Sequence, residues 1–220
     1  MSLFSRIFLS GTLLLGACAI ASGQSSSGRF DSEVQELASQ MPANKKDVVL
    51  FTGSSSIRIW DDMETYFPNY NVVNRGFGGS SMSDLLYYCD DLIFKLRPAQ
   101  IFIYEGDNDL AHCKSPESIL ATSDSLIQKI RRNISTTVPI YFISAKPSIA
   151  RWKMKDNYLL FNEKLEQWTK SKINVMFIDG WSSLIGLDGN VMSDVFKADN
   201  LHLNEKGYSL WSKPIKAVLP

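Results

Sequence analysis

Five apolar segments recur along the chain and predict the strands of a sheet. They cover residues 48–52, 71–74, 100–104, 138–144 and 175–179. Each is short, rich in β-branched or aromatic residues and nearly continuous in hydrophobicity. Such segments are typical of strands that are buried on both faces, as in a parallel sheet.

Segments with helical spacing lie between these strands. Leucines and isoleucines recur at helical intervals from Ser83 to Leu96, and Pro98 ends that helix. Ser115 and Pro116 suit the N-cap and the first position of another helix. Further helices are expected over residues 31–41, 155–172 and 204–217. The alternation of strand and helix predicts an α/β fold, a three-layer α/β/α sandwich around a five-stranded parallel sheet.

The first 28 residues have the pattern of an export signal followed by a tether. Arg6 is the only charged residue before Arg29, an apolar run fills residues 7–21, and a polar stretch of serine and glycine follows. The apolar run is short for a membrane-spanning helix. We therefore expect residues 1–28 to be signal peptide and tether, and residues 29–220 to form a single domain.

Two modes of processing fit this signal. Residues 15–18 resemble a bacterial lipobox, in which Cys18 is lipidated, becomes the new N-terminus and anchors the protein to a membrane. In the alternative, cleavage after Ala21 removes Cys18. Both modes predict an exported protein. It would be a periplasmic or outer-membrane-anchored lipoprotein, or a secreted protein. Cys89 and Cys113 could then form a disulfide or remain as two buried free thiols.

The charge balance is neutral, with 23 basic and 23 acidic residues. It lacks the basic surplus of nucleic-acid-binding proteins, so no nucleic-acid partner is expected. It leaves the oligomeric state open.

Candidate chemistry gathers at the predicted strand ends, where ligands bind in sheets of this kind. Ser55 follows the first strand, and a serine hydroxyl needs a base beside it to act as a nucleophile. The chain has only two histidines, His112 and His202. Asp199, three residues before His202, could orient its ring, whereas His112 has no such partner.

The second and third strand ends offer hydrogen-bond donors. Glycines 76, 78 and 79 follow the second strand, where they either permit a tight turn or present a backbone N–H to a substrate. Asn108 follows the third strand and carries a side-chain amide. Two such donors can stabilise an oxyanion during acyl transfer.

Together these segments resemble the SGNH, or GDSL-like, hydrolase superfamily. The first motif, residues 53–60, reads Gly-Ser-Ser-Ser-Ile-Arg-Ile-Trp, and residues 74–79 read Asn-Arg-Gly-Phe-Gly-Gly. The third motif, residues 106–109, reads Gly-Asp-Asn-Asp, and the fourth, residues 199–202, reads Asp-Asn-Leu-His and has the spacing Asp-x-x-His. The resemblance implies a flavodoxin-like strand order and a catalytic set of Ser55, His202 and Asp199. It also implies an oxyanion hole made by Ser55, Gly79 and Asn108.

Two positions depart from the family pattern. Ser54 stands where the family usually has an aspartate that takes no part in catalysis, which favours a branch with the Gly-Ser-Ser-Ser-Ile-Arg-x-Trp motif. Glu105 precedes the third motif and could alter the charge of the pocket.

The expected activity is cleavage of carboxylic esters through an acyl-enzyme, with no metal and no cofactor. Short acyl or acetyl esters fit best, and the substrate would be a small molecule or a glycan or lipid ester. Lysophospholipase or thioesterase activity on lipids is an alternative, and so is a non-catalytic carbohydrate-binding protein. Trp152, in the loop after the fourth strand, could flank an acyl or sugar group or simply pack on a neighbouring helix.

Two other classes fit poorly. The glycine run at 76–79 lacks the third glycine of a dinucleotide-binding fingerprint. A calcium loop starting at Asp107 would need glycine and glutamate where the chain has Cys113 and Ser118.

Overall fold

A five-stranded parallel sheet forms the centre of the computed structural model, which describes residues 28–219. Its strands are β1 (Val48–Gly53), β2 (Asn71–Gly76), β3 (Gln100–Tyr104), β4 (Ile140–Ile143) and β5 (Val175–Ile178). They lie in the order β2-β1-β3-β4-β5, and every neighbouring pair is parallel. The predicted α/β fold with flavodoxin-like order is therefore confirmed. The expected signal peptide, tether and Cys18 lie outside the described residues.

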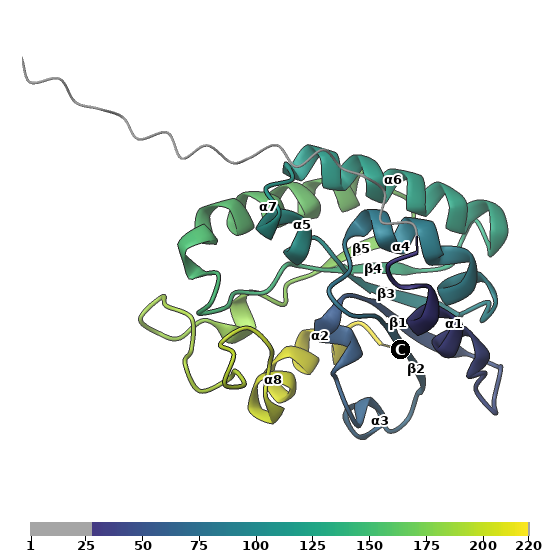
Figure 1. The fold of residues 1–220 in the computed structure, drawn as a ribbon, viewed down its shortest axis with the longest axis horizontal. Helices are drawn as coiled ribbons and strands as arrows, with labels where there is room; N and C mark the ends of the chain where they lie inside the picture. The colour runs from purple at the N-terminus through teal and green to yellow at the C-terminus, as the bar shows by residue number, and fades with distance from the viewer. Residues whose placement is uncertain (1–27, 220) are drawn as a thin grey trace, which may run out of the picture.

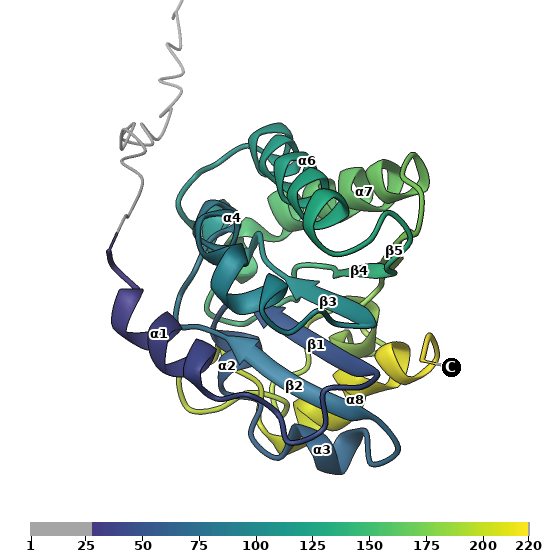
Figure 2. The same cartoon turned by 90° about the vertical axis from the view of Figure 1, so that its right-hand side faces the viewer.

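Helices cover both faces of the sheet (Figures 1 and 2). One layer contains α1 (Asp31–Ser39), α4 (Met82–Cys89), α6 (Pro116–Asn133) and α7 (Lys155–Lys170). The other contains α2 (Ser55–Arg58), α3 (Met63–Tyr66) and α8 (Glu205–Lys216). Alternate strand residues feed the two cores: Leu50 and Ile101 pack under the first layer, whereas Phe51 and Phe102 stack in the second. The sheet is thus buried on both sides, as its apolar strands predict.

Several element boundaries differ from the prediction. The helix expected from Ser83 to Leu96 is α-helical only to Cys89 and continues as a π-helical turn, η1 (Asp90–Phe94). Strand β4 begins at Ile140 rather than Val138, because Pro139 has no N–H to offer to the ladder. Ser115 caps α6 as expected and accepts a hydrogen bond from the N–H of Ser118.

Five short elements were not predicted, because they span too few residues to show a period. They are α2, α3, α5 (Asp107–Ala111) and the 3₁₀ turns η2 (Trp152–Met154) and η3 (Ser182–Leu184). Two of them, α2 and α5, begin at the carboxyl ends of β1 and β3. Both therefore lie at the edge of the sheet where ligands bind in this fold.

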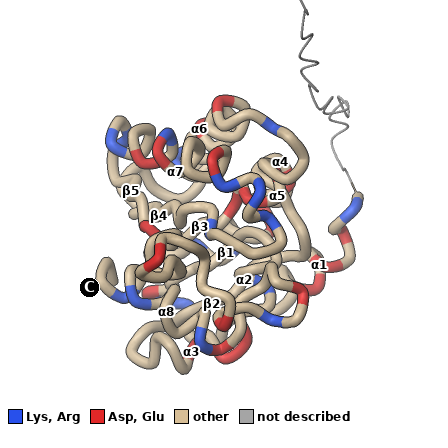
Figure 3. Tube along the Cα trace, turned by 90° about the vertical axis from the view of Figure 1, so that its left-hand side faces the viewer, with Lys and Arg blue, Asp and Glu red and all other residues tan. Residues whose placement is uncertain are grey.

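Cys89 is buried and free, so it forms no disulfide with Cys113. Burial raises the pKa of the Cys89 thiol to about 11. Cys113 is exposed, so the expectation of two buried thiols holds for Cys89 only. Basic and acidic positions are interspersed along the trace (Figure 3). Among residues 28–219, no helix combines the length and hydrophobicity required to span a bilayer.

Candidate active site

Ser55 is the first residue of α2 and sits directly beyond the end of β1. The turn between them requires Gly53, which has a φ of 128° and would place a side-chain Cβ 2.1 Å from the carbonyl oxygen of Tyr104. Ser55 is partly exposed, whereas Ser54 and Ser56 are 1% and 2% exposed. Of the three consecutive serines, Ser55 is therefore the one whose hydroxyl can meet a substrate.

His202 and Asp199 belong to a short segment that we call the histidine loop, residues 197–202. Oδ1 of Asp199 accepts hydrogen bonds from the N–H groups of Leu201 and His202, both at 2.9 Å. Asn200, between them, has a left-handed φ of 56°, which asparagine tolerates better than most residues. The aspartate thus shapes the backbone turn that carries the histidine.

A chain of hydrogen bonds joins these three residues. His202 Nε2 lies 2.9 Å from Oγ of Ser55, and His202 Nδ1 lies 2.6 Å from Oδ2 of Asp199. Partial burial opposes ionisation of Asp199, but hydrogen bonds from the ring and backbone of His202 and from Leu201 lower the pKa of Asp199 to about 2. A carboxylate only accepts hydrogen bonds, so Nδ1 carries the proton and Nε2 is left to accept from Ser55. The structure thus brings the predicted nucleophile, base and orienting carboxylate into contact.

His112 has no part in this chain. Its Nδ1 lies 2.7 Å from the backbone oxygen of Asn108, within the same helical turn. Its contact is therefore local, as expected for the histidine without an aspartate partner.

The predicted oxyanion donors lie at three strand ends. Among the described residues, the N–H groups of Ser55 and Gly79 donate to no protein acceptor. Gly79 has a φ of 64°, a conformation that favours glycine. Asn108, in α5, is 9% exposed and donates from Nδ2 to the carbonyl oxygen of Ser80 at 2.9 Å, so its amide retains a second N–H. We call Gly79, Ser80, Asn108 and the groups that hold them the oxyanion side.

A buried ionic cluster supports Asn108, and sequence reasoning missed it. Asp107 is 4% exposed, and its carboxylate accepts hydrogen bonds from Arg151, Tyr158 and Tyr104. The Lys146 ammonium, which is fully buried, lies 4.0 Å from the same carboxylate. Burial alone would raise the pKa of Asp107, but the two cations lower it below its usual value. Asp107 is therefore held as a carboxylate inside the protein.

The loop that follows β4 connects this cluster to the histidine loop. Lys146 Nζ donates to the carbonyl oxygen of Leu201 at 2.6 Å, and the N–H of Ala150 donates to the carbonyl oxygen of Asn200 at 3.0 Å. Arg151, at the far end of the loop, donates to Asn108. One loop thus contacts both halves of the candidate site. The only sequence signal was that a lysine and an arginine follow a strand end.

Glu105 lies at the end of β3 and is 2% exposed. Its Oε1 accepts a hydrogen bond of 2.6 Å from Ser80 Oγ, and its Oε2 has no partner among the described residues. Burial raises the pKa of Glu105 well above its usual value, and the charge of Asp109 adds to that rise. Burial therefore favours the protonated, neutral form of Glu105, and its effect on the charge of the pocket stays a prediction.

The carboxylates of the third motif are engaged by protein groups. Asp107 binds Arg151, and Asp109 accepts from Lys114 at 2.9 Å and from the N–H of Met82 at 3.0 Å. Within residues 28–219, no group of three potential metal ligands comes together.

Trp152 packs against the protein body. Its ring stacks on Trp181 with centroids 6.0 Å apart and planes 16° apart, and Lys155 lies over it. Trp152 was expected either to flank a substrate group or to pack against the protein, and the structure shows that it packs on Trp181.

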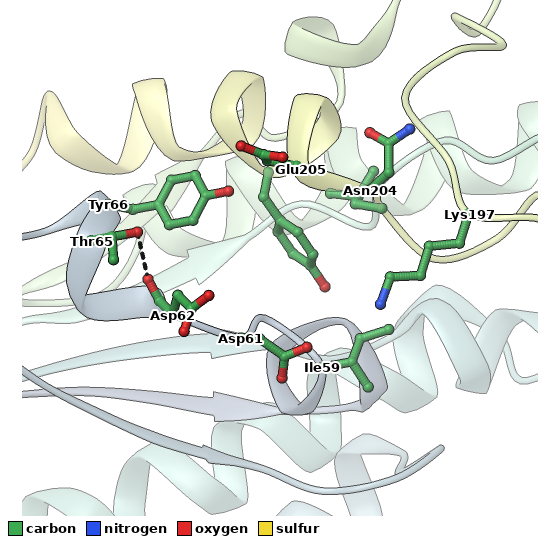
Figure 4. A pocket seen from close by; sticks show the side chains of 10 residues that line it. Ile59, Asp61, Asp62, Thr65, Tyr66, Lys197, Asn204 and Glu205 are labelled. Atoms are coloured by element: carbon green, nitrogen blue, oxygen red, sulfur yellow. Dashed lines mark hydrogen bonds between the residues drawn. The ribbon is translucent and has the colours of Figure 1, made fainter.

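A separate hollow of about 250 Å³ lies between α3 and the start of α8 (Figure 4). Asp61, Asp62 and Glu205 line it together with Lys197. Ser55, His202 and Asp199 are not among its lining residues, so it is distinct from the hydrogen-bonded chain described above.

Residues 23–210 match the profile of the GDSL-like Lipase/Acylhydrolase family. A search of curated proteins gave no match. Solved structures with the same fold include a protein from Streptococcus pneumonia, with a TM-score of 0.74 and 21% identity over 86% of this chain and 90% of that one.

Two further structures are similar. A GDSL-like lipase from Bacteroides thetaiotaomicron has a TM-score of 0.69 and 19% identity, covering 86% of this chain and 96% of that one. An acetylxylan esterase from Geobacillus stearothermophilus has a TM-score of 0.63 and 14% identity, covering 80% and 95%. At these identities the likeness establishes the shared fold.

Proposed function

The chain belongs to the GDSL-like lipase/acylhydrolase family, and from this premise we propose that it is a serine esterase that cleaves short acyl or acetyl esters. The observation that carries the proposal is the chain of hydrogen bonds from Ser55 through His202 to Asp199, with distances of 2.9 and 2.6 Å. A serine hydroxyl held by a histidine that is itself oriented by a carboxylate is the arrangement that nucleophilic acyl transfer needs.

In the proposed reaction, Ser55 Oγ attacks the ester carbonyl carbon while its proton passes to Nε2 of His202. The carbonyl oxygen becomes an oxyanion, which accepts hydrogen bonds from the N–H groups of Ser55 and Gly79 and from the Asn108 amide. His202 then returns the proton to the departing alcohol, which leaves an acyl group on Ser55. Water, deprotonated by His202, attacks the acyl-enzyme, and the proton returns to Ser55 as the carboxylic acid leaves.

Asp199 serves the histidine in two ways in this scheme. Its Oδ2 fixes the proton on Nδ1, and its negative charge stabilises the imidazolium that forms when Ser55 is deprotonated. The low pKa of Asp199, about 2, keeps that charge present throughout the neutral and mildly acidic range. The scheme also requires a neutral His202, since only an unprotonated Nε2 can accept the proton of Ser55.

An acetylated sugar is our first choice of substrate class. The support is the likeness to an acetylxylan esterase over 80% of this chain, which is a likeness of fold. Lysophospholipids and acyl thioesters are the alternatives, and a bound but uncleaved sugar would indicate a carbohydrate-binding protein.

The test is a panel of esters from acetate to long-chain acyl groups, together with an acetylated xylo-oligosaccharide and a lysophospholipid. We expect turnover of the short esters by the wild type and none by Ser55→Ala. Ser56→Ala is the matched control, because it removes a neighbouring hydroxyl that is 2% exposed, and it should retain activity. Normal turnover by Ser55→Ala would overturn the proposal.

We also propose that the protein is exported and that Cys18 is lipidated after cleavage of the preceding segment. The support is the sequence pattern of residues 6–21 alone. The mass of the mature protein from its native host tests it: a diacylglyceryl group on Cys18 is expected, whereas an unmodified N-terminus after Ala21 would contradict lipidation.

A further inference from the structure

We propose that Arg151 is a positioning residue that fixes the Asn108 amide with an N–H directed at the reacting carbonyl oxygen. This inference rests on the proposed esterase function and names a residue that the four sequence motifs do not contain. Arg151 lies in the loop after β4, 43 residues along the chain from Asn108.

The chemistry of the two neighbours of Asn108 specifies one orientation of its amide. Arg151 Nη2 lies 3.0 Å from Oδ1 of Asn108, and a guanidinium has donors but no acceptor. The carbonyl oxygen of Ser80, 2.9 Å from Nδ2, can only accept. If the amide were rotated by 180°, its NH₂ group would face the Arg151 guanidinium, which only donates, and its oxygen would face the Ser80 carbonyl oxygen, which only accepts. The amide oxygen is therefore held toward Arg151 and the nitrogen toward Ser80.

One amide hydrogen remains after these contacts. Nδ2 carries two, and Ser80 takes one of them. The remaining N–H is the donor that the oxyanion would use in the proposed reaction. Because the donor is oriented before substrate arrives, no reorganisation is needed as charge develops, which is the condition under which such donors are most effective.

Arg151 is itself held in place. Its Nη1 donates to the carboxylate of Asp107 and, at 3.1 Å, to the backbone oxygen of Asp107. Tyr158 donates to the same carboxylate, and Lys146 lies 4.0 Å from its other oxygen. The Arg151 side chain is 19% exposed. The guanidinium fork thus bridges Asp107 and Asn108, and a lysine ammonium cannot reproduce that planar two-sided contact.

A purely structural role would be to neutralise the buried charge of Asp107. Positioning of Asn108 and neutralisation of Asp107 predict different results when Arg151 is replaced in the presence and in the absence of the Asn108 amide. If Arg151 acts through Asn108, its replacement should matter only while the Asn108 amide is present. If it only neutralises Asp107, its replacement should have the same effect with or without that amide.

The experiment is a double-mutant cycle of Arg151→Lys and Asn108→Ala, with p-nitrophenyl acetate as substrate and thermal unfolding recorded for each variant. Loss of one oxyanion donor costs about 10²–10³-fold in kcat, so we expect Arg151→Lys to lose about 10–100-fold in kcat with KM little changed. In the Asn108→Ala background the same change should cost less than about 3-fold, since residues that act as a unit are not additive. Arg132→Lys, on an exposed face of α6, is the matched control.

A wild-type kcat in Arg151→Lys, or an equal loss in both backgrounds, would overturn the inference. If Arg151→Lys does not fold, the pair Arg151→Met with Asp107→Asn removes both charges together and should show the same loss of kcat. Normal kcat in that pair would also overturn it. A wild-type protein that hydrolyses no ester and is not labelled at Ser55 would instead refute the proposed function, and this inference with it.

Discussion

The two halves of the candidate site are built in different ways. The histidine loop is exposed, with 47% of the Asp199 side chain and 21% of the His202 side chain accessible, and its key contact spans three residues of sequence. The oxyanion side is buried: Asn108 is 9% exposed and Asp107 is 4% exposed. Its contacts join residues that are 28, 43 and 51 positions apart and that follow three different strands.

This difference predicts different consequences of substitution. An exposed carboxylate can be replaced at little cost in stability, because water solvates whatever remains. A buried ion that loses its partner leaves an uncompensated charge inside the protein. The histidine loop should therefore be a place where activity is lost without unfolding, and the oxyanion side a place where activity and stability are lost together.

The largest effect is expected for Asp199→Asn in the histidine loop. An asparagine cannot fix the proton on Nδ1 in the same way, and loss of the equivalent contact in a serine triad costs about 10⁴-fold in kcat. The Tm should change little. Steady-state kinetics and a thermal melt measure both quantities, and Asp194→Asn, another exposed carboxylate in the same region, is the control. A variant with near-normal kcat would show that Asp199 does not orient His202 or stabilise its protonated form during the reaction.

Lys146→Met, on the oxyanion side, should lower the free energy of unfolding as well as the activity. It removes a cation from beside Asp107 and a donor from the carbonyl oxygen of Leu201. Breaking a buried ion pair typically costs about 3–5 kcal/mol in the free energy of unfolding, and we expect about 3 because Arg151 remains. Urea denaturation measures it, with the exposed Lys206→Met for comparison. Equal stability of the two variants would contradict the contrast drawn between the two halves.

The smallest effect is expected for Glu105→Gln. The folded-state pKa of Glu105 is raised, so the folded protein retains a proton that the unfolded chain releases above about pH 4.3. Glu105 therefore contributes stability below that pH and loses the contribution as the pH rises toward its folded-state pKa.

Glutamine is neutral at every pH, so the Tm of Glu105→Gln minus that of the wild type should increase from pH 4 to pH 8. We expect a change of about 2–4 °C, which corresponds to about 1 kcal/mol in a protein of this size. A difference that is constant with pH would mean that Glu105 ionises normally in the folded protein. Asp194→Asn, at an exposed position, should show no such trend.

The fold could be predicted in outline because each strand is a short apolar run and each long helix has a clear period. The five strands and α1, α6, α7 and α8 were therefore placed within a few residues. The π-helical turn at Asp90–Phe94 could not be seen, since its apolar spacing resembles that of the α-helix before it. The short helices that carry Ser55 and Asn108 also lack a period of their own.

The residues of the candidate site also fall into those that the sequence predicts and those that it does not. Asp199 and His202 are visible as a pair because their contact is local, and Ser55 follows from the strand that precedes it. Arg151, Lys146 and Asp107 were missed because only the packing of distant segments brings them together. Glu105 departs from the family pattern in the sequence, but the rise in its pKa depends on burial, which a single sequence does not specify.

The most direct test of the central claim is to label the wild-type protein with a fluorophosphonate and locate the adduct by peptide mass spectrometry. A nucleophile activated by His202 and Asp199 should give one adduct per chain on Ser55, little labelling in Asp199→Asn and none in Ser55→Ala. An unlabelled wild type, or an adduct on another residue with Ser55 unmodified, would contradict the assignment of Ser55 as the nucleophile.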